Sequence, residues 1–220
     1  MSPGSNVAGM SDVDAHAERF DAKAADYDDS NSPEYRACLE LVIDHARELL
    51  RRSGDGVTAR SDSGEVLLDL GTGTGAVALA LAGEADRVVG RDVSEGMLER
   101  ARRKADERGV GTVSFGTGRF REPAYEGPVD VVTSNYALHH LDDAGKREAI
   151  GTIAALEPRA FVLGDLIYFA EPDEPAHDPS VDDPATVGHL ADALTDAGFV
   201  LTAVERVTDG IGVLVAERAR

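Results

Sequence analysis

A short apolar run followed by alternating glycines constrains this chain more than any other feature. Residues 66–70 read Val-Leu-Leu-Asp-Leu, and residues 71–75 read Gly-Thr-Gly-Thr-Gly. The apolar run predicts a buried strand. The glycines predict a tight turn into a helix, because glycine has no Cβ and tolerates positive φ. Such a turn brings backbone close to a ligand and points the free N–H groups of a helix start at it. The stretch therefore predicts a loop that binds a nucleotide-type cofactor.

Strand and helix patterns alternate after this loop. The predicted strands cover 65–70, 87–92, 112–115, 129–134 and 160–166, and the predicted helices cover 75–83, 94–108, 142–155 and from 183 or 184 to 197. Continuously apolar strands between helices predict a parallel sheet that is covered on both faces. Thr208-Asp209-Gly210 between two apolar runs predicts a final hairpin. We expect an α/β fold: a Rossmann-like three-layer α/β/α sandwich, with a mostly parallel seven-stranded sheet and an antiparallel C-terminal hairpin strand.

The N-terminal quarter of the chain is organised differently. Residues 1–14 are small, polar and acidic, so we expect them to be disordered, and they lack the basic start and apolar core of a signal peptide. Residues 15–53 are expected to form a helical lid segment, in which Ser32-Pro33-Glu34 opens the second helix. A linker rich in Gly, Ser and Asp then leads to the cofactor-binding domain, residues 64–220.

The composition indicates where the protein is located in the cell and which partners it disfavours. A single cysteine, Cys38, excludes an internal disulfide, and no apolar run reaches the about 18 residues of a membrane span. We expect a cytoplasmic protein that does not enter a membrane. Forty-one acidic residues against 22 basic ones give a net charge of −19, with only three lysines. This balance disfavours nucleic acid as a partner, because phosphate backbones are bound by basic patches.

The same charge predicts a dependence of folding on salt. In dilute buffer, repulsion among the charges of a chain with a net charge of −19 weakens the compact state. At about 1 M salt the Debye length is roughly 3 Å, so this repulsion is screened. The acidic, lysine-poor composition is typical of a protein from a salt-rich cytoplasm, and an ordinary acidic protein is the alternative. We expect the circular dichroism spectrum to lose its native form after dialysis into dilute buffer. An unchanged spectrum would contradict this prediction.

The glycine loop alone does not identify its cofactor. Gly71, Gly73 and Ala76 satisfy the dinucleotide fingerprint G-x-G-x-x-[GA], and Asp92 follows about 20 residues later. Asp92 could accept the two hydroxyls of a ribose in NAD or in S-adenosylmethionine. Asp69 favours S-adenosylmethionine. A carboxylate before the first glycine would repel the negative pyrophosphate of NAD, but it would attract the positive sulfonium and α-amino group of S-adenosylmethionine.

Several further stretches carry a family resemblance. They are residues 88–98, 130–141, 156–158, 197–199 and, near the N-terminus, 20–28. Together with the glycine loop, they cover roughly residues 18–217 in collinear order. The chain resembles the class I S-adenosylmethionine-dependent methyltransferases, and among them the small-molecule type 11 branch related to the quinone-biosynthesis methyltransferases.

The resemblance implies which residues contact S-adenosylmethionine. They are Asp69, Gly71, Thr72, Gly73, Asp92, Val93, Met97, Phe120 and Asn135. Asp69 and the glycine loop would support the methionyl part, Asp92 the ribose, and Asn135 the amino-acid end. Val93 and Met97 would lie against the adenine, although Met97 can also be read as helix packing. Arg119 stands where the family usually has an acid for the adenine amino group, so Phe120 and backbone carbonyls would have to replace that contact.

Methyl transfer from a sulfonium needs positioning more than acid–base catalysis. The candidates near the acceptor are Tyr136, His139 and His140 after the fourth strand, with Asp165 as a hydrogen-bond anchor. None of them is assigned as a catalytic residue. We expect no metal site, because adjacent histidines should point apart and no third ligand is evident. The prediction is a methyltransferase acting on a small-molecule acceptor that the sequence leaves unnamed, as it does the oligomeric state. A binding protein without turnover and an NAD-binding oxidoreductase are the alternatives.

Overall fold

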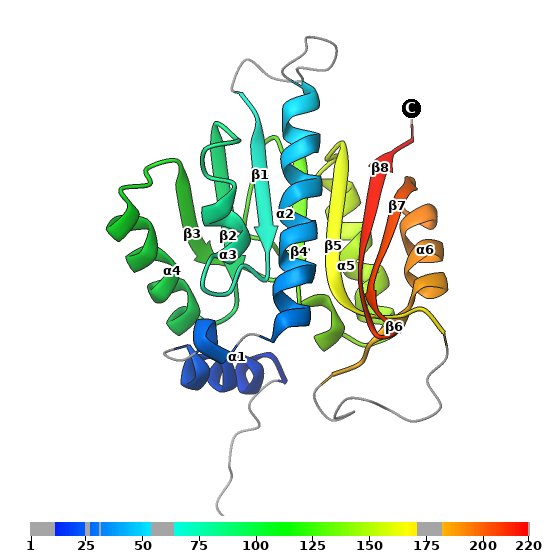
Figure 1. Cartoon of the computed structure of the whole chain (residues 1–220), viewed down its shortest axis with the longest axis horizontal. Helices are drawn as coiled ribbons and strands as arrows, with labels where there is room; N and C mark the ends of the chain where they lie inside the picture. The colour runs from blue at the N-terminus through cyan, green and yellow to red at the C-terminus, as the bar shows by residue number, and fades with distance from the viewer. Residues whose placement is uncertain (1–11, 25–26, 31, 54–63, 171–181, 220) are drawn as a thin grey trace, which may run out of the picture.

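A twisted sheet between two layers of helices makes up the molecule (Figure 1). The computed structural model describes residues 12–24, 27–30, 32–53, 64–170 and 182–219. The strands are β1 (Val66–Leu70), β2 (Arg87–Asp92), β3 (Val113–Thr117), β4 (Val131–Asn135), β5 (Ala160–Tyr168), β6 (Ala185–Thr186), β7 (Phe199–Thr208) and β8 (Ile211–Arg218). Their order is β3-β2-β1-β4-β5-β8-β7, and β6 pairs with β5 off this path.

The sheet confirms the predicted topology with one addition. β8 runs antiparallel to both β5 and β7, whereas the remaining pairs are parallel. The prediction of seven strands missed β6, because a two-residue strand is too short to produce an alternating pattern. Asp69 of β1 lies opposite Gly90 of β2 and Thr133 of β4. The carboxyl ends of these central strands therefore meet at one edge of the sheet.

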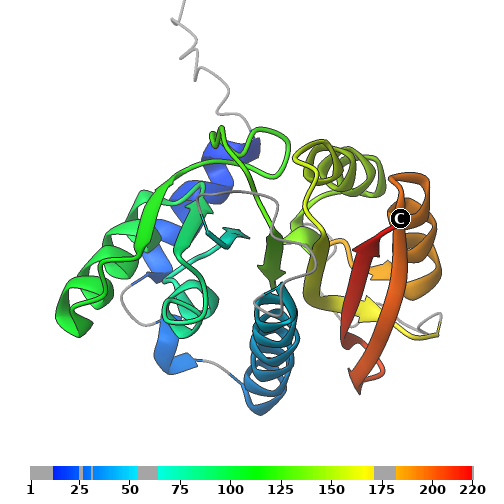
Figure 2. The ribbon, with the colours of Figure 1, turned by 90° about the horizontal axis from the view of Figure 1, so that it is seen from above.

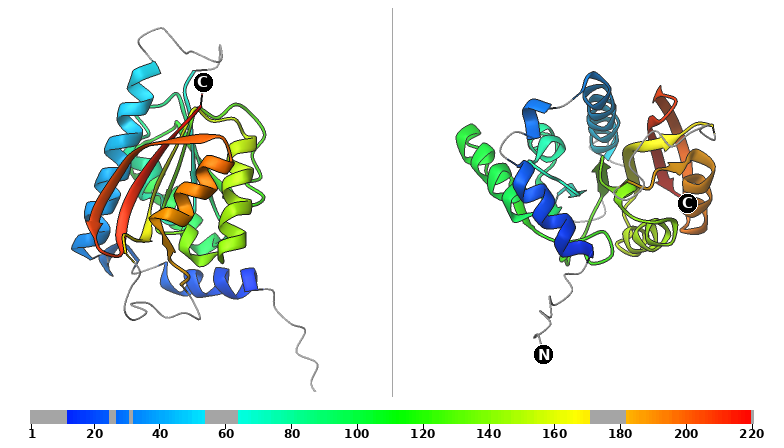
Figure 3. Two further views of the ribbon diagram at one scale, coloured as in Figure 1. Left: turned by 90° about the vertical axis from the view of Figure 1, so that its right-hand side faces the viewer. Right: turned by 90° about the horizontal axis from the view of Figure 1, so that it is seen from below.

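Helices cover both faces of the sheet (Figures 2 and 3). α2 (Pro33–Ser53), α3 (Ala76–Ala80) and α4 (Glu95–Arg108) lie on one face, and α5 (Asp143–Ala155) and α6 (Val187–Asp196) lie on the other. Successive strand residues point to opposite faces, so Leu67 joins the core under α2 while Leu68 joins the core under α5 and α6. This double burial explains why the strand sequences are continuously apolar.

Local signals placed most helix ends correctly. Ser94 accepts a hydrogen bond from the Met97 N–H and begins α4, as its sequence position predicted. Gly198 follows α6 at a φ of +86° and confirms the predicted C-terminal glycine. The predicted start of α6 at residue 183 or 184 was wrong: Thr186 caps this helix instead, because β6 first extends the chain along β5.

The N-terminal segment divides into two parts. α1 (Asp12–Lys23) lies below the carboxyl edge of the sheet in Figure 1, followed by the 3-10 helix η1 (Tyr27–Ser30). α2 does not fit the expected lid over 15–53, because Cys38, Val42 and Ala46 are fully buried against the sheet. Asp12 to Asp14 are helical, whereas residues 1–11 of the segment expected to be disordered, and most of the linker, fall outside the described residues. Within the described ranges, we find no helix with the length and apolar character needed to cross a membrane.

Candidate cofactor and acceptor site

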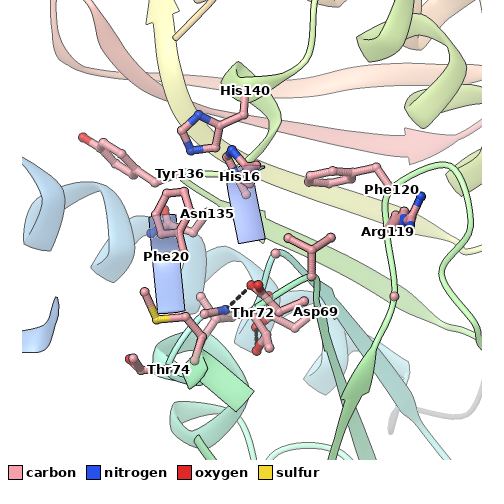
Figure 4. Close-up of a pocket in the computed structure, with 18 of the residues that line it drawn as sticks. His16, Phe20, Asp69, Thr72, Thr74, Arg119, Phe120, Asn135, Tyr136 and His140 are labelled. Carbon is pink, nitrogen blue, oxygen red and sulfur yellow. Dashed lines mark hydrogen bonds between the residues drawn. The ribbon is translucent and has the colours of Figure 1, made fainter. Parts of the chain in front are cut away.

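A cavity of about 450 Å³ opens at the carboxyl edge of the sheet (Figure 4). The glycine loop after β1, the end of β2, the segment after β3 and the segment after β4 line it, together with residues of α1, η1 and α2. All of the residues that the sequence predicted as cofactor contacts line this cavity, as do Tyr136 and His140. His139 does not line it. The location agrees with the rule that ligands of open α/β sheets bind outside the carboxyl ends of the strands.

Glycine is required in the loop after β1 by both conformation and space. Gly71 and Gly73 have φ values of +68° and +52°. A Cβ built on Gly71 would lie 2.3 Å from the Ala137 Cβ, in the segment after β4. The two segments therefore approach each other at a distance that only glycine permits, and the loop backbone forms one wall of the cavity.

Asp69 is a buried carboxylate at the end of β1. Its two oxygens accept hydrogen bonds from the Thr72 Oγ1, at 2.6 Å, and the Thr133 Oγ1, at 2.8 Å. Burial raises the pKa of Asp69 to about 6, against the opposing effect of these two hydroxyls. The carboxylate is therefore mostly charged at neutral pH but poorly compensated by the protein. A cation bound in the cavity would supply the missing compensation.

Asp92 ties the glycine loop to the start of α4. Its Oδ2 accepts a hydrogen bond from the Gly73 N–H at 2.8 Å, and its Oδ1 accepts one from the Ser94 N–H at 2.9 Å. Burial raises the pKa of Asp92, and the backbone hydrogen bonds oppose that rise. The carboxylate is thus held in place at the cavity, where a ribose hydroxyl could donate to it.

The wall beyond Asp92 is mainly apolar. Val93, Met97 and Phe120 line it, and only 1% of Met97 is exposed. Met97 therefore serves as core packing and as cavity wall at once, so the two interpretations of this residue are compatible. Arg119 also lines the cavity, on the same side as Phe120 in Figure 4. Its guanidinium offers no acceptor, and its backbone N–H donates to the Glu122 carbonyl.

Two buried polar groups lie at the end of β4 and directly after it. The Asn135 Nδ2 and the Tyr136 Oη are buried and have no hydrogen-bond partner within the part of the chain that the structure describes. Tyr136 also has a φ of +55°, which is uncommon for a bulky residue and typical of functional sites. Burial raises the pKa of Tyr136, with Cys38 and Asp165 adding to the effect. At neutral pH the phenol is therefore protonated and can act as a hydrogen-bond donor.

The two adjacent histidines have different surroundings. His139 does not line the cavity and contacts Asp165 instead. Its ring Nδ1 makes a short hydrogen bond with the Asp165 Oδ1, and its backbone N–H donates to the Asp165 Oδ2 at 3.0 Å. Asp165 is thus an anchor, as predicted. The expectation that the histidines point apart was wrong, because their ring centres lie 4.0 Å apart. They sit in the 3-10 turn η2 (Leu138–His140), where neighbouring side chains are separated by about 120° rather than the 180° of a strand.

The N-terminal segment supplies four cavity residues, of which the sequence had indicated only Phe20 and Tyr27, within the resembling stretch 20–28. They are His16, Phe20, Tyr27 and Tyr35. The His16 and His140 ring centres lie 4.5 Å apart, and Figure 4 shows these two rings side by side. Burial lowers the pKa of His16, and Arg19 lowers it further. The collinear Phe20–Asp28 segment was the available signal, but its position over the cavity depends on long-range contacts.

Two carboxylates fasten this segment to the cofactor side of the cavity. The Asp21 Oδ1 accepts from the Ser94 Oγ and the Gly96 N–H, at the start of α4. Asp28 accepts from the Thr74 Oγ1 at 2.6 Å and from Arg100 and Lys104 at 3.1 Å. Burial alone would raise the pKa of Asp28, but these hydrogen bonds lower it below its ordinary value. α1 and η1 are therefore coupled to the glycine loop and to α4.

We expect replacement of Asp28 with Asn to loosen this coupling. The lowered pKa means that the charged form stabilises the docked segment above the ordinary pKa of an Asp, and that this contribution is lost as the pH falls through the folded-state value. At neutral pH, D28N should therefore speed amide hydrogen exchange in α1 and weaken cofactor binding several-fold. Asp44→Asn on the exposed side of α2 is the matched control. Equal exchange in D28N and D44N would contradict the coupling.

The fold and the cavity together define a class of protein. A parallel sheet with an antiparallel β8, a glycine loop after β1 and a carboxylate at the end of β2 form the framework of the class I methyltransferases. Residues 67–157 match a family model described as a methyltransferase domain. An uncharacterized methyltransferase of Geobacillus sp. (strain WCH70) is 32% identical over 184 residues, which cover 81% of this chain and 76% of that protein. The chain belongs to the methyltransferase family.

Two further comparisons agree with this assignment. Nocamycin O-methyltransferase of Saccharothrix syringae is 32% identical over 168 residues, covering 73% of this chain and 56% of that enzyme. A crystal structure of magnesium protoporphyrin IX methyltransferase from Synechocystis PCC 6803 with bound S-adenosylmethionine has the same fold, with a TM-score of 0.72 and 21% identity over 96% of this chain and 99% of that one. Relatives from Geobacillus and Anoxybacillus do not support the predicted salt-rich source.

Proposed function

We propose that this protein transfers the methyl group of S-adenosylmethionine to a small-molecule acceptor that binds in the same cavity. One observation carries the proposal: the cofactor loop and the wall of aromatic and histidine side chains line a single cavity. The Asp69 carboxylate would compensate the cationic methionine end, and Asp92 would accept the ribose hydroxyls. Val93, Met97 and Phe120 would enclose the adenine, and the buried Asn135 Nδ2 would donate to the amino-acid end.

Positioning and exclusion of water would supply most of the rate. When bound, S-adenosylmethionine supplies a methyl group on a sulfonium that is already activated for an in-line displacement. The protein holds the acceptor beside it, which lowers the barrier by several kcal/mol without a catalytic side chain. Of the two adjacent histidines, His140 is the one that an acceptor could contact, because it lines the cavity and His139 does not.

The nature of the wall supports a small organic acceptor. Phe20, Tyr27, Tyr136 and His140 provide flat, largely apolar surfaces, whereas the net charge of −19 disfavours a nucleic acid. The small-molecule type 11 branch and a cytoplasmic location are parts of this proposal.

Calorimetry and a turnover assay test the proposal in two stages. We expect S-adenosylhomocysteine to bind the purified chain and NAD not to bind. Binding of NAD alone would instead favour an oxidoreductase. In the second stage, release of S-adenosylhomocysteine is measured after the protein and S-adenosylmethionine are mixed with fractions of a metabolite extract. Cofactor binding without release in any fraction would favour a binding protein without turnover.

A further inference from the structure

Three side chains converge next to the acceptor side of the cavity. The Asp182 Oδ1 lies 3.6 Å from the His139 Nε2 and 3.3 Å from the His140 Nδ1. The three ligand atoms all lie within 4.8 Å of one another. The side chains are mostly buried, with exposed fractions of 6%, 11% and 21% for His139, His140 and Asp182. We propose that His139, His140 and Asp182 form a binding site for one divalent transition-metal ion such as Zn²⁺.

The separations fit the edges of a metal tetrahedron. Zinc binds imidazole nitrogen and carboxylate oxygen at about 2.0–2.1 Å, so two ligands at the tetrahedral angle are about 3.3–3.4 Å apart. The distances from Asp182 to the two histidines lie close to this value. They are longer than the about 2.7–3.2 Å of most N–H···O hydrogen bonds. Two imidazoles and a carboxylate are also the donor types that suit zinc and its neighbours in the first transition series.

The groups behind the ligands hold them in this arrangement. The Asp165 carboxylate is hydrogen-bonded to the His139 Nδ1, which leaves the Nε2 of that ring as the coordinating atom. A carboxylate behind a ligating histidine is the usual outer-shell partner in metal sites.

Asp182 is positioned by its neighbour in the chain. The Asp183 N–H donates to the His139 carbonyl at 2.7 Å, and the Asp183 carboxylate lies 3.6 Å from the ammonium of buried Lys146. The first contact is a backbone hydrogen bond, so it fixes the position of Asp182 against η2 without needing the Asp183 carboxylate.

Two other histidine–carboxylate pairs among the described residues lack a third ligand there. His189 lies 3.6 Å from Asp143, and His45 lies 3.7 Å from Glu205. In the part of the chain that the structure describes, His139, His140 and Asp182 are the one group of three with ligand atoms this close. Three protein ligands leave a fourth tetrahedral position for water or another oxygen ligand. Because His140 lines the cavity, a bound ion would lie at the cavity wall.

Titration of the metal-free full chain with Co²⁺ tests the site directly. Co²⁺ replaces Zn²⁺ in tetrahedral sites and gives visible absorption bands there. We expect one Co²⁺ per chain, a tetrahedral spectrum, and displacement by Zn²⁺. D182N and H140Q should each weaken Co²⁺ binding by at least about tenfold. D165N should weaken it by about 10- to 100-fold, because Asp165 orients a ligand without touching the metal.

Two controls separate this site from general metal binding. D183N removes the carboxylate that faces Lys146 rather than the histidines, and H189Q breaks a histidine–carboxylate pair of the same length. Both should bind Co²⁺ as the wild type does. The proposal fails if the wild type binds Co²⁺ no more tightly than D182N and H140Q, or if the spectrum is octahedral. In that case, the cluster is a set of histidine–carboxylate ion pairs. These measurements do not involve methyl transfer, so their outcome is independent of the proposed function.

A rise in melting temperature gives a second readout. Zn²⁺ should raise the melting temperature of the wild type, D183N and H189Q but not that of D182N, because a ligand that binds only the folded state stabilises it. Equal rises in D182N and the wild type would overturn the proposal.

Discussion

Replacing Asp92 with Asn should weaken binding of S-adenosylmethionine and S-adenosylhomocysteine by about 100-fold. The carboxylate accepts the Gly73 and Ser94 N–H groups and faces the cavity, so an amide would place an NH₂ against one of these donors. It would also remove the charge that accepts a ribose hydroxyl. Hydrogen bonds to charged groups contribute about 1.5–3 kcal/mol each, and about 1.4 kcal/mol corresponds to a factor of ten. Calorimetric titration with S-adenosylhomocysteine measures the effect.

Asp106→Asn is the matched control for this experiment. Asp106 lies on α4, the helix that follows Asp92, but it is exposed and does not line the cavity. We expect D106N to bind S-adenosylhomocysteine as the wild type does. If D92N retained an affinity within about threefold of the wild type, Asp92 would not be the ribose contact.

Replacing Asp69 with Asn should have opposite effects on stability and on activity. The folded-state pKa of about 6 lies above the ordinary value of 3.8, so the buried charge costs stability at neutral pH. One pKa unit corresponds to about 1.36 kcal/mol, which makes this cost roughly 2–3 kcal/mol. In the amide, one of the Thr72 and Thr133 hydroxyls can accept from the NH₂ while the other still donates to the carbonyl oxygen. D69N should therefore be more stable than the wild type at pH 8 but should bind the cationic methyl donor less tightly.

The pH dependence checks the origin of this effect. The unfolded chain loses the Asp69 proton near pH 4 and the folded chain near pH 6. The wild type should therefore lose stability relative to D69N as the pH rises through this window, and the difference should level off above it. Urea unfolding of the ligand-free proteins from pH 4 to pH 8 measures this, with exposed Asp192→Asn as the control. If D69N were less stable than the wild type at pH 8, the interpretation of Asp69 as a costly charge would be wrong.

The sequence predicted the parallel strands, the final hairpin and the glycine loop because their signals are local. A strand buried on both faces is apolar at most positions, as in Val66–Leu70, and a positive φ favours glycine, as at Gly71. Ser94 and Gly198 marked helix ends for the same reason. The predicted cofactor residues line one cavity because the carboxyl ends of neighbouring parallel strands meet at one edge. Their individual contacts with the cofactor stay predictions.

The tertiary structure decided the features that depend on residues distant in sequence. It placed α1 over the cavity through Asp21 and Asp28, and it assigned α2 to the core rather than to a lid. It also brought Asp182 to two histidines more than 40 residues earlier in the chain. No local pattern encodes such a meeting, because it results from the pairing of β6 with β5 and from the 3-10 turn at η2. By itself, the glycine loop after β1 predicted where a cofactor binds, because its signal is local; the packing of distant segments determined which side chains surround that cavity.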